Sequence, residues 1–146
     1  MLNHTLNVSG ILEGFVLDHI AAGKSMEIYK YLNLEKLDYC VAIIKNAKSN
    51  KMGKKDIIKI ECPTDTINMD ILGFIDNNIT VNIIKNERIV EKKELSLPNK
   101  ISNVIKCKNP RCVTSIEQGL EHIFLLTDSE KKTYRCRYCE EKYKWN

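Results

Sequence analysis

The sequence has little histidine, the side chain that most often transfers protons in active sites, and little tryptophan or proline. Its 146 residues include only three histidines, one tryptophan and three prolines. It contains no Ser/His/Asp or HExxH arrangement, and the spacing of Gly10, Gly14 and Gly23 fits neither a GxGxxG nor a Walker A phosphate loop. No catalytic residue can be named, so a stand-alone enzyme is the least favoured class of function.

Long apolar runs are also missing. A membrane-spanning helix needs roughly 18 to 20 consecutive apolar residues, and no stretch approaches that length. The first ten residues contain no lysine or arginine, and Glu13 and Asp18 interrupt the apolar stretch that follows. We expect a protein without a signal peptide or membrane span, located in the cytoplasm.

Charge and cysteine are distributed unevenly along the chain. Residues 1–97 carry 13 basic and 13 acidic side chains, whereas residues 98–146 carry 10 and 6 and account for the whole net charge of +4. Four of the six cysteines also lie in the second part. Pro98 disfavours helix at Leu97 and interrupts a strand there. We therefore predict two domains, residues 1–97 and residues 98–146.

The first part reads as alternating strands and helices. Extended segments are expected at 6–11, 14–20, 37–47, 55–61, 79–85 and 88–95, and helices at 24–34 and from Thr64 or Asp65 to about Ile75. This order is βαββαβ with one further β segment, which is typical of an α+β, ferredoxin-like sandwich. Cys40 lies within the apolar run Tyr-Cys-Val-Ala-Ile-Ile and is expected to be a small core residue.

Four polar residues of this part are candidates for ligand binding. Asp18 and His19 close an apolar β segment, Lys59 alternates with Ile58 and Ile60, and Lys92 shares a strand face with Val90. Taken one by one, each is more often a turn cap or a solvated strand residue than a ligand contact. The pattern alone leaves both interpretations open.

The second part carries a metal-binding pattern. Cys107 and Cys112 form C-x4-C, Cys136 and Cys139 form C-x2-C, and 23 residues separate the pairs. In a reducing compartment such clustered cysteines favour a metal over disulfides, and four thiolates leave no open coordination position. We predict one structural Zn²⁺; disulfides and an iron centre of similar spacing are the alternatives.

The second domain has few large apolar residues for a core. They are Val104, Ile105, Ile116, Leu120, Ile123, Phe124, Leu125, Leu126 and Trp145. A structural zinc contributes on the order of 10 kcal/mol in small domains, enough to decide folding. We expect a small all-β zinc domain of the rubredoxin or zinc-ribbon type.

A zinc-ribbon that binds nucleic acid is the alternative function. Zinc with four thiolates adds a charge of −2, which reduces the domain's +4 to about +2. Only Tyr134, Tyr138, Tyr143 and Trp145 offer rings for base stacking. Nucleic acid is therefore an unlikely partner, and the basic residues beside the cysteines equally suit an acidic protein surface.

Five blocks of sequence, taken in order, resemble the regulatory chain of aspartate carbamoyltransferase. They are Gly14–Ile20, Met52–Glu61, Thr80–Asn82, Ser96–Pro98 and the four-cysteine pattern. The resemblance covers nearly the whole chain. It implies a non-catalytic subunit of pyrimidine biosynthesis that binds CTP as feedback inhibitor and ATP as activator. It also implies a regulatory dimer whose zinc domain holds catalytic chains.

The resemblance assigns roles to individual residues. It places nucleotide contacts at Asp18, His19, Lys59 and Lys92, a backbone contact to the base near Ile11, and the zinc ligands at Cys107, Cys112, Cys136 and Cys139. Lysine and histidine would neutralise part of the triphosphate, and Asp18 would accept hydrogen bonds from ribose hydroxyls. Glu87 stands where the well-known family member has an aromatic residue near the base.

Overall fold

The structure is a computed structural model that describes residues 10–145, and the chain divides into two compact units between Ser96 and Leu97. Most of the extended segment expected at 6–11 lies outside the described residues, and residues 10 and 11 are not in a strand. No helix among residues 10–145 has the length and apolarity needed to cross a membrane.

The N-terminal unit is a five-stranded sheet with helices on one face. Its elements are β1 (Gly14–Ala21), α1 (Ser25–Tyr31), the 3-10 helix η1 (Leu34–Lys36), β2 (Cys40–Ser49), β3 (Gly53–Glu61), the 3-10 helix η2 (Met69–Ile71), α2 (Leu72–Ile75), β4 (Thr80–Lys85) and β5 (Arg88–Glu94). The strand order is β2-β3-β1-β4-β5, and every neighbouring pair is antiparallel. The predicted α+β, ferredoxin-like class is confirmed, with β5 added at one edge.

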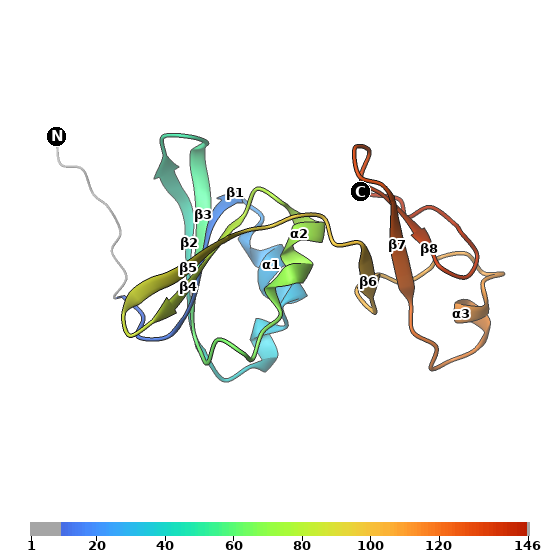
Figure 1. The fold of residues 1–146 in the computed structure, drawn as a ribbon, viewed down its shortest axis with the longest axis horizontal. Coiled ribbons are helices and arrows are strands. Elements are labelled where there is room, and N and C mark those ends of the chain that lie inside the picture. Colours follow the sequence, from blue (N-terminus) through green and yellow to red (C-terminus); the bar gives the residue numbers. More distant parts are fainter. Residues whose placement is uncertain (1–9, 146) are drawn as a thin grey trace. The chain divides into compact units, whose positions relative to one another are not determined.

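Side-chain alternation separates the two faces of this sheet. Phe15, Leu17, Ile58 and Ile60 are buried, and they pack with Ile28 of α1 in one core cluster. Successive strand residues point to opposite faces, so the residues between them lie on the other side. Figure 1 shows α1 and α2 on the same side of the sheet. The opposite side is the helix-free face.

Two sequence expectations for this unit are wrong. The second helix does not begin at Thr64 or Asp65, because the loop forms a turn in which the Thr66 hydroxyl and amide both donate to the Pro63 carbonyl, and helical structure begins at Met69. Cys40 is exposed and not in the core, since it begins the edge strand β2 and pairs with Glu61 on the helix-free side.

The C-terminal unit is a small sheet with one helical turn. Its elements are β6 (Lys100–Ser102), α3 (Val113–Ile116), β7 (Ile123–Asp128) and β8 (Thr133–Cys136), and the antiparallel order is β6-β7-β8. The core consists of Ile101, Ile105, Ile123, Phe124 and Tyr134. Of the core candidates, Ile116, Trp145 and Leu125 are 68%, 43% and 37% exposed, so the expectation is wrong for these three. Ile116 is exposed because α3 is a single turn that presents this side chain to solvent.

Candidate functional site

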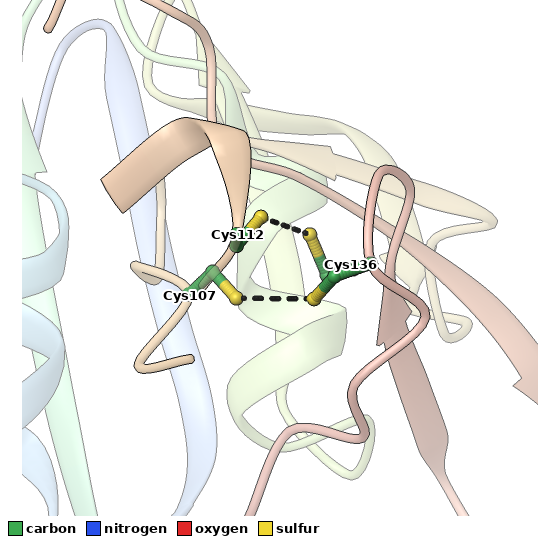
Figure 2. Close-up of side chains that lie close together, drawn as sticks. Cys107, Cys112 and Cys136 are labelled. Carbon is green, nitrogen blue, oxygen red and sulfur yellow. Dashed lines mark hydrogen bonds between the residues drawn. The ribbon is translucent and has the colours of Figure 1, made fainter. Parts of the chain in front are cut away.

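The four cysteines of the C-terminal unit lie in one cluster. Their Sγ atoms are all within 4.8 Å of one another. Cys107 Sγ is 3.5 Å from Cys139 Sγ, and Cys112 Sγ is 3.7 Å from Cys136 Sγ. Figure 2 shows Cys107 and Cys112, from the segment before α3, facing Cys136 at the end of β8. Two segments that are distant in sequence thus offer four sulfur ligands to one point.

Two tight turns shape the cluster. In the first, the Asn109 side chain accepts a hydrogen bond from the Arg111 amide at 3.0 Å, and the Asn109 carbonyl accepts one from the Cys112 amide at 3.0 Å. In the second, the Glu140 amide donates to the Cys136 carbonyl at 2.8 Å, and Glu140 adopts a left-handed φ of 64°. These backbone bonds hold each cysteine pair in its loop.

Neighbouring polar groups are directed at the sulfur atoms and their backbone. The Thr114 hydroxyl donates to Cys112 Sγ at 3.1 Å, and the Glu141 amide donates to Cys139 Sγ at 3.4 Å. The Cys107 amide donates to His122 Nδ1 at 3.2 Å. Donors aimed at sulfur stabilise thiolates, the form that binds a metal. Sequence reasoning missed Thr114 and His122, since neither belongs to the cysteine spacing.

The thiols differ in their acidity. Burial, together with the neighbouring thiols, raises the pKa of Cys107 to about 12, and burial likewise raises the pKa of Cys136. Burial also opposes ionisation of Cys112, but the hydroxyl and amide of Thr114 outweigh it and lower the pKa of that thiol to about 7. Four adjacent thiolates repel one another, so a divalent cation is what makes their joint ionisation favourable.

A cross-strand row on the helix-free face contains two of the predicted nucleotide contacts. Lys59 is paired with Val16, Val16 with Asn82, and Asn82 with Lys92. Residues directly opposite each other in an antiparallel sheet share a face. Lys59 and Lys92 therefore lie on one surface, with two strands between them.

Asp18 and His19 lie at a bulge of β1, beside this row. His19 has a left-handed φ of 59°, and its Nδ1 is 3.1 Å from the hydroxyl of Thr80. Asp18 Oδ1 accepts a hydrogen bond from the His19 amide at 2.7 Å. It also forms an ion pair with Lys55, whose Nζ lies 2.9 Å away. Partial burial raises the pKa of Asp18, but the Lys55 ammonium and the His19 amide reverse this, and the net shift is downward.

The segment around Ile11 lies just before β1, which begins at Gly14. The Leu12 carbonyl accepts a hydrogen bond from the Glu87 amide at 3.0 Å, which ties the segment to the turn joining β4 and β5. Glu13 accepts hydrogen bonds from the Cys62 and Thr64 amides. The backbone at residues 11–13 is thus fixed beside Glu87, whose side chain is exposed.

Sequence reasoning missed three polar residues of this face. Lys55 pairs with Asp18, the Thr80 hydroxyl contacts His19, and Asn82 lies between Lys59 and Lys92 in the row. Asn82 also donates to the Val16 carbonyl at 3.4 Å. Only the strand register brings these residues together, and the register is not visible in a linear motif.

Three of the four rings named as candidates for base stacking contact other groups of the unit. Tyr134 is fully buried, and its hydroxyl donates to the Pro98 carbonyl at 2.6 Å. Tyr143 and Trp145 contact each other edge to face at 5.3 Å. Tyr134 is thus part of the core, whereas Tyr138 and Trp145 are 46% and 43% exposed.

Comparison with known proteins identifies the family. Residues 6–96 match the model of the aspartate carbamoyltransferase regulatory chain, allosteric domain, and residues 99–146 match the metal binding domain of the same chain.

Similar relatives carry the name aspartate carbamoyltransferase regulatory chain. The one from Clostridium botulinum is 55% identical, over 94% of each chain. The one from Clostridium tetani is 51% identical, over 95% of this chain and 96% of its own. The relative from Bifidobacterium longum is 44% identical, over 95% of this chain and 99% of its own. On this agreement along nearly its whole length, the chain belongs to the family of aspartate carbamoyltransferase regulatory chains.

Proposed function

We propose that this regulatory chain binds the nucleoside triphosphates CTP and ATP on the helix-free face of its N-terminal unit. The observation that carries the proposal is the row Lys59–Val16–Asn82–Lys92, which sets two lysines on one face beside His19. Two ammonium groups and an imidazole neutralise part of a triphosphate as point charges, without a glycine-rich loop.

Each predicted contact has a role in this proposal. Lys59, Lys92 and His19 bind the phosphates, Asp18 accepts hydrogen bonds from the ribose hydroxyls, and the backbone near Ile11 binds the edge of the base. The hydrogen bond from the Glu87 amide to the Leu12 carbonyl supports a rigid backbone beside Ile11. An exposed carboxylate at Glu87 can accept hydrogen bonds from the amino group of a base and repel phosphates, so Glu87 bears on how tightly each nucleotide binds.

We assign Zn²⁺ as the metal of the four-cysteine cluster. A tetrahedral site with Zn–S bonds of about 2.3 Å places its sulfur atoms about 3.8 Å apart. The Sγ separations of 3.5 and 3.7 Å fit that requirement. Cys107, Cys112, Cys136 and Cys139 would fill the coordination sphere, so the zinc cross-links two turns of a thin core and supplies no chemistry to a substrate.

The C-terminal unit, residues 98–146, is proposed to dock onto the catalytic chains, and the unit of residues 1–97 to carry the allosteric site. Val113, Ile116 and Tyr138 lie next to the cysteine turns in sequence and are 37%, 68% and 46% exposed, which supplies apolar contact area.

The edge strand β5 of the N-terminal unit suits self-association as a regulatory dimer, because its Ile89 and Val90 side chains are 62% and 57% exposed. We infer a non-catalytic, cytoplasmic subunit.

Assembly with catalytic chains tests this function. The zinc-loaded chain is mixed with purified catalytic chains, and the complex is isolated by size-exclusion chromatography. Carbamoyl transfer is then measured against aspartate concentration with and without CTP or ATP. We expect a stable complex whose aspartate saturation shifts with nucleotide. Free catalytic chains, which lack the regulatory site, are the control. A complex that forms but whose aspartate saturation is unchanged by either nucleotide would refute the allosteric role and leave the docking role intact.

A further inference from the structure

The hairpin formed by β2 and β3 carries an unusual concentration of lysine. Residues 45–55 contain five lysines and no acidic residue. Lys45, Lys48, Lys51 and Lys54 are exposed, and Lys55 is partly buried. Figure 1 shows this hairpin extending beyond the rest of the N-terminal unit. We call residues 45–55 the lysine hairpin.

The fold itself does not account for this charge. Lys48 and Lys54 are direct cross-strand partners, an arrangement that is unfavourable for like charges. Among the side chains that the structure describes, no carboxylate forms an ion pair with Lys45, Lys48, Lys51 or Lys54. Lysines protect an edge strand from unwanted pairing, which explains Lys45 and Lys48 on β2. Protection of an edge strand does not explain Lys51 at the tip of the hairpin or Lys54 on the inner strand β3.

The lysine hairpin is a local excess of positive charge in a unit without net charge. The part of the chain up to residue 97 has 13 residues of each sign, yet five of its lysines fall within residues 45–55, which contain no acidic residue. Such a local excess produces a field that draws anions to the lysine hairpin.

The lysine hairpin adjoins the proposed nucleotide face. Its last residue, Lys55, contacts Asp18 at 2.9 Å. Four residues further along β3, about 13 Å at the usual strand rise, lies Lys59. The Debye length is about 8 Å at physiological ionic strength and about 30 Å at 0.01 M salt. The hairpin field therefore reaches the face at low salt and is partly screened at physiological salt.

We propose that the lysine hairpin steers nucleoside polyphosphates onto the helix-free face. The inference rests on the proposed nucleotide site and adds how ligands reach it. The exposed lysines attract the phosphate chain during approach and make no required contact in the bound state. They increase the association rate constant and leave the dissociation rate constant unchanged.

Stopped-flow kinetics with a fluorescent ATP analogue and the full zinc-loaded chain tests this proposal. The variant Lys48→Gln/Lys51→Gln/Lys54→Gln removes three charges from the hairpin. The matched control Lys30→Gln/Lys36→Gln/Lys85→Gln removes three exposed lysines elsewhere in the same unit. We expect the hairpin variant to associate about 5-fold more slowly at 10 mM salt and less than 2-fold more slowly at 0.5 M salt. Its dissociation rate should match that of the wild type.

The outcomes separate the steering from the site itself. Equal slowing in both variants would show an effect of net charge alone and overturn the proposal. Normal association in the hairpin variant, or a loss confined to faster dissociation, would also overturn it. A wild-type chain that binds no nucleotide at all would instead overturn the proposed site. The corresponding AMP analogue should show a smaller salt dependence, because it carries fewer phosphates.

Discussion

Lys55 and Asp18 form an ion pair that joins β3 to the bulge of β1, with Nζ 2.9 Å from Oδ1. The two side chains are 17% and 25% exposed, so water screens the pair only in part. The same Asp18 oxygen accepts the amide hydrogen of His19. The pair therefore fixes the bulge that presents both predicted contacts of β1.

Replacing Lys55 by Met is expected to lower the free energy of unfolding by about 1 kcal/mol at neutral pH. The folded-state pKa of Asp18 lies below its ordinary value of 3.8, so the stabilisation is present above that pH and is lost as the pH falls through the folded pKa. Urea unfolding followed by circular dichroism at pH 7 and pH 3 measures both effects. The control Lys54→Met removes an adjacent exposed lysine and should cost nothing. Equal losses in the two variants would contradict a specific pair.

Asp56 is a buried carboxylate on which three backbone segments converge. It accepts hydrogen bonds from the amides of Gly23, Ser25 and Asn46, at 3.1, 3.2 and 3.0 Å. Burial raises its pKa, but the Ser25 side chain and these amides outweigh the effect and lower it. Asp56 thus joins the start of α1 and the bulge of β2 to β3.

The substitution Asp56→Asn is expected to lower the free energy of unfolding by about 2 to 4 kcal/mol at pH 7. The neutral asparagine side chain accepts weaker hydrogen bonds than the carboxylate, and its NH₂ group is a buried donor without an acceptor. The loss should shrink as the pH falls below the ordinary carboxyl pKa of 3.8, since the wild-type group then becomes protonated too. Chemical denaturation across pH 3 to 7 measures it, with exposed Asp65→Asn as the control. A pH-independent loss would argue against the carboxylate charge.

Removing one sulfur ligand should unfold the C-terminal unit alone. Cys112→Ser replaces a buried ligand and is expected to abolish stoichiometric zinc and the near-ultraviolet circular dichroism of the Tyr134–Trp145 cluster. The sheet of the N-terminal unit has its own core and should persist in far-ultraviolet spectra. Cys40→Ser, at an exposed cysteine outside the cluster, should keep its zinc. Retention of zinc and native unfolding behaviour in Cys112→Ser would contradict the assignment.

Local patterns in the sequence were enough to predict much of this fold. Strand alternation around Ile58 and Ile60 indicated which face Lys59 occupies, and the structure buries both isoleucines on the side away from it. The helix predicted from Thr64 failed because tertiary bonds overrode a capping signal: the Thr64 amide bonds the Glu13 carboxylate and the Thr66 hydroxyl bonds Pro63. The burial predicted for Cys40 failed because an apolar run does not reveal which strand becomes an edge.

The site was less accessible to sequence reasoning than the fold. The cysteine spacing pointed to one cluster because the ligands occupy two short turns. Lys59 and Lys92 lie 33 positions apart, and their common face depends on the pairing of β3, β1, β4 and β5. Lys55 and Thr80 entered the site only through contacts across strands. Long-range register carries this information, and only a resemblance or a structure supplies it.

Calorimetric titration of CTP and ATP into the zinc-loaded chain tests the central claim most directly. The strand register supplies a matched pair of variants: Lys92 lies on the helix-free face, whereas Lys93 is paired with Val81 on the helix side. We predict that both nucleotides bind, that Lys59→Ala and Lys92→Ala each weaken binding about 10-fold, and that Lys93→Ala leaves it unchanged. No heat of binding at millimolar nucleotide, or equal weakening by Lys92→Ala and Lys93→Ala, would contradict a nucleotide site on this face.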